Sequence, residues 1–465
     1  MTKRLWWIGA LLLTFALVAA ACGSSDDGDG DSTGSTETTE ASGDSGDDDS
    51  ADTTEPADDG SDDSADTTEP ADDGTEPAGD PEPAPGFDGE TINLGYLTDE
   101  SGALAILGVP LTAGSQIYWD YVNEELGGVG GRYQVQLDVG DTKDDPAAAV
   151  QEYQRLKDDA LLFAQILSTP PTQAVLEFLN EDNIVGVPGS LAGTWANEAV
   201  LLPNGAAYEY EMINIADWFV NDSGLGSVDT VQCVVSVNDL YGEVGLDGLE
   251  YAAGELGFEL VEKRTMNRND TDFAATVAAL NEAGCEAVYA ITVPREQSAM
   301  MTEAATQGFD PIWLGALPAY LNLLAGPNFE KFYVALDAPD FNDSSSPGMV
   351  KFLERFETYK PNADDEPNSF FFSGYYQQLS VHALLEKAVE MGDLSREGIA
   401  AAMAALGEVD TEGLTAENYI YGLPEDRVPT SASRIFVFDP DNPPNLLTEV
   451  ALLDSELNDG YTLGG

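Results

Sequence analysis

Histidine and cysteine, two residue types on which nucleophilic catalysis often depends, are scarce in this chain. His382 is the only histidine, and it falls in a helical pattern without a GxSxG motif or a nearby cysteine, so neither a Ser-His-Asp nor a Cys-His arrangement is indicated. The same inventory excludes a zinc site built from His and Cys, and no GxxxxGK[ST] loop is present. Because carboxylates are abundant, a two-acid glycosidase stays open as an alternative. We predict a protein that is not an enzyme and uses no metal and no cofactor.

The N-terminal region is typical of a secreted protein. Lys3 and Arg4 precede an apolar run that ends in three alanines and Cys22, which predicts a signal peptide over residues 1–21. The alanines before Cys22 resemble a bacterial lipoprotein signal, so we expect Cys22 to be lipidated and to hold the protein on the membrane. An ordinary cleaved signal with an incidental Cys22 is the alternative.

A low-complexity segment follows the signal. Residues 22–90 contain many acidic residues and neither Lys nor Arg, and the segment Asp48–Gly60 recurs unchanged at Asp62–Gly74. Since this repeat offers no apolar residue larger than Ala or Pro, it cannot build a core. We predict a disordered acidic linker between the anchor and the folded part.

The charge of the chain limits its partners. The sequence has 85 acidic and 18 basic residues, a net charge of −67. Nucleic acid is therefore excluded as a partner, because binding it requires a basic surface. No second long apolar stretch appears, so we expect the mature chain to be extracytoplasmic, attached to the cell membrane through Cys22 alone.

The remaining cysteines allow two interpretations. Cys233 and Cys285 could pair in an oxidising compartment, but each also fits as a small buried residue in or beside a strand. We favour two separate buried thiols.

Short β-branched runs alternate with helical patterns through the rest of the chain. Strands are predicted at Ile92–Leu97, Gln134–Val139, Leu161–Leu167, Ile184–Val187, Val231–Val237, Glu259–Arg264, Ala287–Thr292, Ile312–Leu317, Arg434–Phe438 and Leu447–Leu453. Helices are predicted at Thr112–Glu125, Pro146–Asp158, Thr172–Glu181, Tyr241–Leu256, Asp272–Ala283, Glu296–Gln307, Pro347–Tyr359, Phe371–Met391 and Arg396–Leu406. This alternation indicates an α/β fold with parallel sheets covered on both faces.

The strand–helix series runs twice, which indicates two lobes. We expect two doubly wound parallel-sheet lobes that close on a ligand by hinge motion.

Several segments together resemble the type I periplasmic binding proteins. The stretches are INLGYLTDESGALAILGVPLTAG from Ile92, LSTPPTQA from Leu167 and NDLYGEVG from Asn238, and their order and spacing are specific to the group. The group with the greatest similarity is the branched-chain amino-acid type that serves ABC importers. The resemblance implies three crossings between the lobes, near residues 205, 336 and 417. It gives a first lobe of residues 91–205 and 337–417 and a second lobe of residues 206–336 and 418–465.

The resemblance also implies where a ligand binds. Hydroxyl and backbone N–H groups of the first lobe would hold the ligand's carboxylate, without a buried cation. The aromatic ring of Tyr241 would close over the ligand from the second lobe. The positions expected to contact it are Ser101, Leu107, Ser168, Thr169, Gly189, Ser190, Leu191, Tyr241, Thr292 and Leu317.

Leu317 departs from the pattern of amino-acid binders. They usually have an acidic residue at this position, which pairs the ligand's ammonium group. An unpaired buried ammonium is costly, and neither Glu296 nor Glu100, the possible substitutes, matches the motif. We therefore expect a ligand without an α-amino group, such as an amide, a urea, a carboxylate or an aromatic acid.

These observations predict the substrate-binding lipoprotein of an ABC importer. It would capture a small polar solute (amino acid, amide, urea or organic acid) and present it to a membrane permease, while partner ATPase subunits supply the energy. The alternative is a ligand-sensing receptor of the same fold that acts through a signalling partner.

Overall fold

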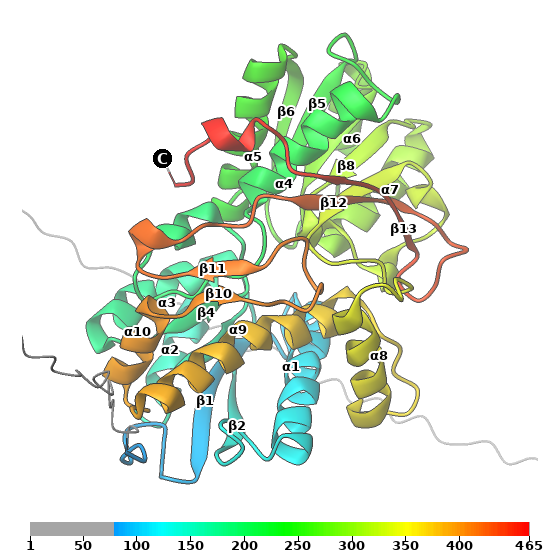
Figure 1. Cartoon of the computed structure of the whole chain (residues 1–465). Helices are drawn as coiled ribbons and strands as arrows, with labels where there is room; N and C mark the ends of the chain where they lie inside the picture. Colours follow the sequence, from blue (N-terminus) through cyan, green and yellow to red (C-terminus); the bar gives the residue numbers. More distant parts are fainter. Residues whose placement is uncertain (1–78, 465) are drawn as a thin grey trace, which may run out of the picture. The chain divides into compact units, whose positions relative to one another are not determined.

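The computed structural model describes residues 79–464 of the chain. The predicted signal peptide, the lipidation of Cys22 and the repeats of the acidic linker lie outside the described residues. The part that is described contains two main sheets with helices packed around them (Figure 1).

The first sheet has the strand order β2-β1-β3-β4, and all of its pairs are parallel. Its strands are β1 (Thr91–Thr98), β2 (Gln134–Asp141), β3 (Phe163–Ile166) and β4 (Gly186–Pro188). The helices α1 (Ala105–Glu125), α2 (Pro146–Leu156) and α3 (Thr169–Asp182) connect them. Parallel pairing requires such crossover helices, and the fold class inferred from the alternation is confirmed for this half.

The second sheet has the order β13-β12-β9-β8-β7-β5-β6. Its strands are β5 (Gln232–Val237), β6 (Leu260–Met266), β7 (Ala287–Ile291), β8 (Ile312–Gly315), β9 (Phe332–Leu336), β12 (Ser433–Phe438) and β13 (Leu447–Leu453). The helices α4 (Tyr208–Asp217), α5 (Leu240–Leu256), α6 (Ala274–Glu282) and α7 (Pro294–Gln307) belong with it. The strands β5 to β9 pair in parallel, whereas β12 and β13 add an antiparallel edge.

The chain returns to the first sheet before it ends. The helices α8 (Pro347–Tyr359), α9 (Ser369–Met391) and α10 (Arg396–Ala404) share a core with α1. A small sheet of β10 (Gly407–Val409) and β11 (Tyr419–Tyr421) leads back to β12. We call the first sheet with α1–α3 and α8–α10 the first lobe, and the second sheet with α4–α7 the second lobe.

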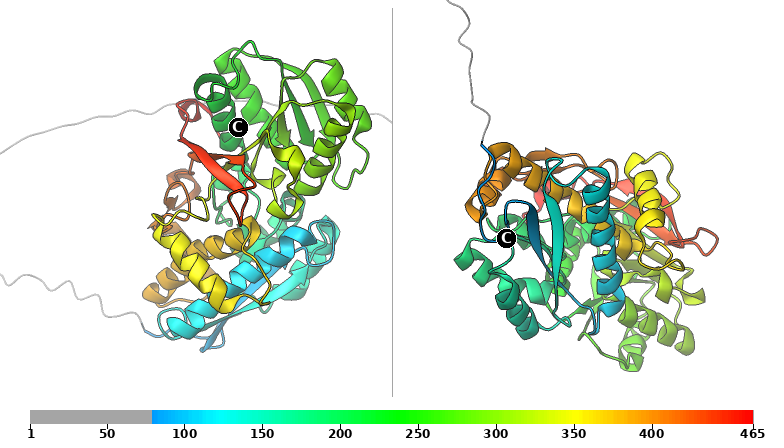
Figure 2. Two further views of the ribbon diagram at one scale, coloured as in Figure 1. Left: turned by 90° about the vertical axis from the view of Figure 1, so that its right-hand side faces the viewer. Right: turned by 90° about the horizontal axis from the view of Figure 1, so that it is seen from below.

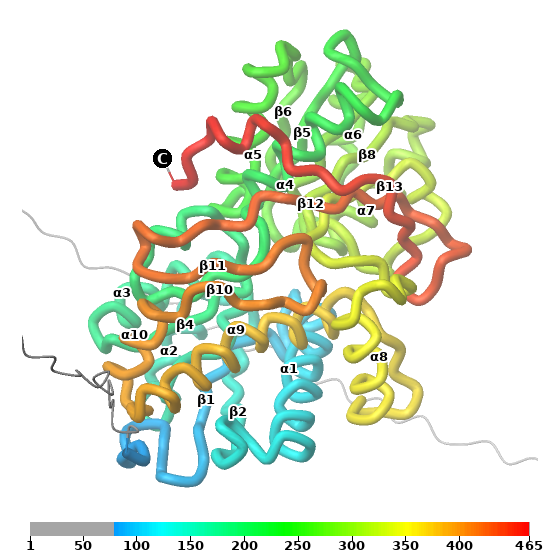
Figure 3. The backbone as a smooth tube through the Cα atoms, viewed as in Figure 1, coloured from blue at the N-terminus to red at the C-terminus, as the bar shows by residue number. Residues whose placement is uncertain are grey.

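The path of the backbone is seen most directly in Figure 3, where the orange and red C-terminal segment runs back to the green second lobe. The left view of Figure 2 shows the green helices of the second lobe gathered apart from the blue first lobe and its yellow helices. The chain thus passes between the lobes three times, before α4, after β9 and after β11. The residue boundaries of the two lobes stay a prediction.

Helices α1 and α9 approach each other to backbone contact. A Cβ atom at Gly114 would lie 1.9 Å from the carbonyl oxygen of Phe371, and one at Gly374 would lie 1.9 Å from that of Leu111. Only glycine fits at both positions. This close packing fixes the N-terminal part of α1, which borders the space between the lobes, against the first residues of α9.

Helices α1 and α4 differ from the prediction for physical reasons. Helix α1 begins at Ala105 rather than Thr112. A proline usually interrupts a helix, but α1 accommodates Pro110 in its second turn and so starts earlier than predicted. Helix α4 is absent from the elements predicted by sequence. Nine of its ten residues are buried, so it lacks the polar face that makes a helix visible in a sequence.

The expectation of two separate thiols is wrong. A disulfide joins Cys233, in β5, to Cys285, just before β7, with the Cα atoms 5.9 Å apart. The strands β5 and β7 are neighbours, which brings the two cysteines within bonding range. Sequence alone did not show which strands are adjacent.

Removing this disulfide should destabilise the second lobe. The bond closes a loop with a sequence separation of 52 residues. We therefore expect the Cys233→Ala/Cys285→Ala protein to lose about 2–4 kcal/mol of unfolding free energy. Urea unfolding measures this, with dithiothreitol-treated wild-type protein as the comparison. An unchanged midpoint in both samples would contradict the prediction.

Candidate functional site

One pocket lies between the two lobes and takes its lining from both. The first lobe contributes side chains from the start of α1, the β3–α3 turn, the end of β4 and the start of α9, and the second lobe contributes the rest. The lining residues are Leu104, Leu107, Leu167, Ser168, Thr169, Gly189, Tyr208, Tyr241, Arg268, Val293, Leu317, Pro318 and Phe370. The free volume is about 60 Å³, so only a small molecule fits in this arrangement of the lobes.

The first-lobe wall is built where β3 ends and α3 begins. Ser168 has a φ of 78°, an unfavourable conformation for a residue with a side chain. Its buried hydroxyl faces the carboxyl of Asp144 and favours the charged form of that carboxyl. The Thr169 hydroxyl lies 2.7 Å from the Ser190 hydroxyl. The first three residues of α3 are Thr169, Pro170 and Pro171. Because proline has no backbone N–H, only Thr169 can donate a backbone hydrogen bond from this part of the helix.

The second-lobe wall is aromatic. Tyr241, in the first turn of α5, is 1% exposed, and its ring centroid lies 4.5 Å from that of Tyr208. The Tyr241 hydroxyl donates to the carbonyl oxygen of Thr292 at 3.1 Å. The Thr292 hydroxyl donates to the side-chain oxygen of Gln297 and not into the pocket. Thr292 therefore acts on the pocket by holding Tyr241.

A charged group completes the lining. The guanidinium of Arg268, which follows β6, lies 2.6 Å from a carboxylate oxygen of Asp239 in its own lobe. It also lies 3.5 Å from a carboxylate oxygen of Asp144 in the first lobe. Burial raises the pKa of Asp144, while the charge of Arg268 acts in the opposite direction. The guanidinium is thus already balanced by acidic side chains of the protein.

Six of the ten predicted ligand positions surround this pocket: Leu107, Ser168, Thr169, Gly189, Tyr241 and Leu317. The other four lie elsewhere. Ser101 is exposed and donates to Asp141, Ser190 lies behind Thr169, Thr292 is buried, and Leu191 lines a different pocket.

Sequence reasoning missed six lining residues: Leu104, Leu167, Tyr208, Arg268, Pro318 and Phe370. Val293, which lies beside the predicted Thr292 and was expected near a ligand contact, also lines the pocket. Tyr208 begins the helix α4 that showed no pattern. Arg268 had a detectable signal, because it follows a parallel strand at the end where ligands of such sheets bind. Phe370 is far away in sequence and comes close only because α9 packs on α1.

No carboxylate lines the pocket at Leu317. The Leu317 backbone N–H donates to the buried carboxyl of Glu211 at 3.0 Å. Glu296 accepts from the Asn269 N–H and Glu100 from the Thr112 hydroxyl, and neither of them lines the pocket. None of the three positions 317, 296 and 100 therefore provides an acidic side chain that could pair with the ammonium group of a ligand in this pocket.

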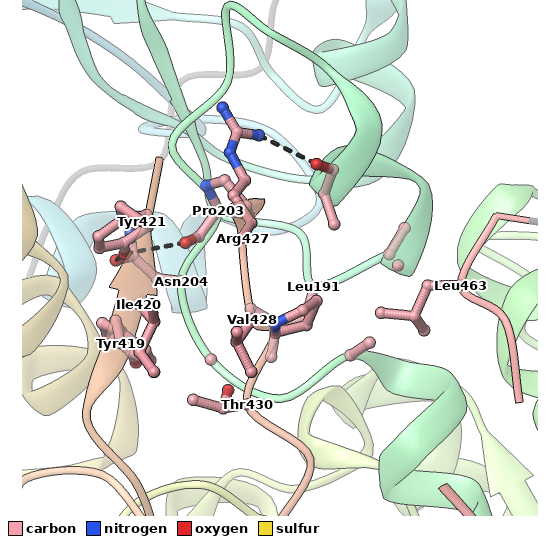
Figure 4. A pocket seen from close by; sticks show the side chains of 16 residues that line it. Leu191, Pro203, Asn204, Tyr419, Ile420, Tyr421, Arg427, Val428, Thr430 and Leu463 are labelled. Carbon is pink, nitrogen blue, oxygen red and sulfur yellow. Dashed lines mark hydrogen bonds between the residues drawn. The ribbon is translucent and has the colours of Figure 1, made fainter. Parts of the chain in front are cut away.

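A second pocket lies at the crossing segments (Figure 4). It has a free volume of about 40 Å³ and a mainly apolar lining that includes Leu191, Ile420 and Val428. Arg427 donates to the carbonyl oxygen of Ala196 at 3.1 Å, and the Tyr421 hydroxyl lies 2.9 Å from the Pro203 carbonyl oxygen. These bonds join the crossing segments, so we assign this pocket to the hinge.

The groups considered for catalysis have structural partners. His382 Nδ1 lies 2.9 Å from the Tyr118 hydroxyl, and Nε2 lies 3.1 Å from Glu386. Within residues 79–464 no group of three or more His, Cys, Asp or Glu is arranged to hold a metal ion. No helix in the same range is long and apolar enough to cross a membrane.

The chain is similar in sequence and in structure to known proteins. A family model described as periplasmic binding protein matches residues 91–443. A fatty acid ABC transporter substrate-binding protein from Thermomonospora curvata has 27% identity and a TM-score of 0.75, covering 82% of this chain and 97% of its own.

A branched-chain amino acid ABC transporter protein from Thermus thermophilus, with bound valine, has 17% identity and a TM-score of 0.68. The match covers 79% of this chain and 97% of that one. A leucine-binding protein from Thermotoga maritima has 17% identity and a TM-score of 0.64, covering 78% and 99%. These two matches show the fold. No curated protein matches the sequence.

Proposed function

Because this chain belongs to the periplasmic binding protein family, we propose that it captures a small, mainly apolar carboxylic acid between its lobes and delivers it to an ABC importer. Family membership places the protein outside the cytoplasm and makes it a substrate-binding protein of the ABC transporter type. The nature of the ligand is the new part of the proposal, and it depends on the lining of the pocket.

Apolar side chains make up most of that lining. Seven residues, Leu104, Leu107, Leu167, Val293, Leu317, Pro318 and Phe370, surround the space. Burying apolar surface contributes about 25 cal/mol per Å², so a hydrocarbon body gains affinity here and a strongly hydrated solute does not.

The polar groups of the first-lobe wall are concentrated at one place, whereas Arg268 and the two tyrosines lie on the second-lobe side. The hydroxyls of Ser168 and Thr169 and the Thr169 N–H lie where β3 ends. Donors of this kind satisfy a carboxylate without a cation. The Thermomonospora curvata protein, described as a fatty acid binder, supports the same class of ligand.

The observation that carries the proposal is the absence of an acid from the lining residues of the pocket. A buried α-ammonium without a partner costs several kcal/mol. Leucine and 4-methylpentanoate differ only in that ammonium group, so the pair tests the proposal without changing shape.

We expect 4-methylpentanoate to raise the melting temperature and leucine to leave it unchanged. A ligand present at 100 times its Kd stabilises the folded state by about 2.7 kcal/mol. Thermal shift measures this, with 4-methylpentanamide as a probe of whether the charge is needed. Stabilisation by leucine equal to that by the acid would contradict the proposal.

Two threonines of α3 provide a matched pair of variants. Thr169 lines the pocket, whereas the Thr172 hydroxyl donates to the Ser168 carbonyl oxygen and lies outside the lining. Thr169→Val should reduce the acid's thermal shift, and Thr172→Val should preserve it. Equal loss in both proteins would show that the hydroxyl of Thr169 has no contact with the ligand.

The attachment to the membrane is part of the proposal. Cys22 after a signal sequence supports a lipid anchor, and the acidic segment that follows supports a long tether. The permease and ATPase subunits are the partners that the family's transport role requires.

A further inference from the structure

The ion pair between Asp144 and Arg268 crosses the space between the lobes. Asp144 lies between β2 and α2 of the first lobe, and Arg268 follows β6 of the second. Their side chains are 4% and 16% exposed. Because both charges are largely buried, the pair is screened by salt less than a surface pair.

The backbone holds Asp144 in a fixed position. Lys143 and Asp144 have φ values of 57° and 55°, a left-handed conformation that residues with a side chain adopt rarely. The loop is fixed on both sides, since the Thr142 N–H donates to the Thr98 carbonyl oxygen at 2.7 Å and Asp145 caps α2. Because this loop is already held in one conformation, the Asp144 carboxylate needs no rearrangement of the loop to meet Arg268.

Arg268 is fixed in the same way from the other lobe. Asp239 accepts from its Nε at 2.6 Å and also caps α5. One face of the guanidinium is thus bound within the second lobe. The contact with Asp144 is the part of the ion pair that exists only while the lobes are together.

Other contacts between the lobes do not combine burial, opposite charge and a position at the pocket. Arg295 donates to the carbonyl oxygen of Ala103 at 2.8 Å but is exposed. Leu321 of the second lobe packs in an apolar cluster with Leu104, Leu107 and Phe370. Arg268 is the charged residue that both lines the pocket and pairs across the lobes.

We propose that Arg268 and Asp144 form a latch that stabilises the closed lobes and slows release of the ligand. Arg268 is a positioning residue in this account, because it acts by holding the first lobe. The inference extends the proposed function by naming the group that links pocket and closure. Its first test does not depend on the ligand.

The first measurement is the distance between the lobes without ligand. Nitroxide labels on Leu126→Cys of the first lobe and Val261→Cys of the second, both exposed, report it by double electron–electron resonance. Asp144→Asn should increase the population with the longer distance about tenfold. Asp182→Asn, which breaks a Lys157 pair within the first lobe, should leave the distribution unchanged.

A double-mutant cycle separates a latch from general damage. If Asp144 and Arg268 act through each other, Asp144→Asn/Arg268→Gln should open the lobes no more than Asp144→Asn alone. Additive opening would overturn the latch, and so would an unchanged distance in Asp144→Asn.

Ligand release provides the second measurement. Stopped-flow dissociation of 4-methylpentanoate should become about tenfold faster in Asp144→Asn. If Asp144→Asn opens the lobes yet the wild-type protein binds none of the acids, the proposed ligand fails and the latch stands. If the wild-type protein binds the acid and Asp144→Asn releases it at the wild-type rate, the latch fails and the ligand stands.

Discussion

Replacing Tyr241 with alanine is expected to weaken binding of the acid about a hundredfold, which corresponds to about 2.8 kcal/mol. The ring is buried against Tyr208 and forms the second-lobe wall of the pocket. Removing it takes away the apolar surface that closes over the ligand. Isothermal titration calorimetry measures the loss.

The same substitution should destabilise the protein by about 3–5 kcal/mol, because it leaves a cavity at a fully packed aromatic site. Tyr241→Phe is the matched control. It keeps the ring and removes only the hydrogen bond to the Thr292 carbonyl oxygen, a loss of about 0.5–1.5 kcal/mol. Wild-type affinity in Tyr241→Ala would show that the ligand does not contact this wall.

Stability should fall as the pH rises from about 4 to 7. Three acidic side chains, Glu209, Glu211 and Asp337, are at most 1% exposed near the crossing segments. Burial raises the pKa of Glu209 to about 7 and that of Asp337 to about 6. Burial also raises the pKa of Glu211 well above its usual range, and the charges of Asp337 and Glu209 add to this effect.

The sign follows from proton binding. A carboxyl whose pKa is higher in the folded state binds more protons when folded, so its protonated form stabilises the fold below the pKa of the unfolded chain. That contribution is lost as the pH passes the folded-state pKa. For Glu209 the window runs from the ordinary glutamate pKa of 4.5 to about 7.

Glu209→Gln should remove the contribution of Glu209 to this dependence and leave those of Glu211 and Asp337. At pH 8 we expect the variant to be more stable than the wild type by about 3 kcal/mol, since each pKa unit is about 1.4 kcal/mol, and near pH 4 the two should be equal. Urea unfolding across this range measures it, with Glu177→Gln on an exposed face of α3 as the control. A constant difference at all pH values would contradict the assignment.

The order of strands and helices could be predicted because most elements are either β-branched runs or have one polar face. Helix α4 has neither property, since it is buried almost throughout. Strand β9 was also missed. The resemblance to type I periplasmic binding proteins did not depend on them, and the match over residues 91–443 confirms it.

The pocket was predictable only in part. Ser168, Thr169 and Gly189 lie at strand ends, where ligands of parallel sheets bind. The pairing of Arg268 with Asp144 joins residues from two lobes, and no local pattern indicates it. The disulfide likewise depends on the adjacency of β5 and β7.

A crystal structure with 4-methylpentanoate would test the central claim most directly. The account predicts the carboxylate within hydrogen-bond distance of the Ser168 and Thr169 hydroxyls, with the hydrocarbon body against Leu107, Tyr241 and Leu317. A ligand bound outside this pocket, or bound leucine with its ammonium against an acidic side chain, would contradict it.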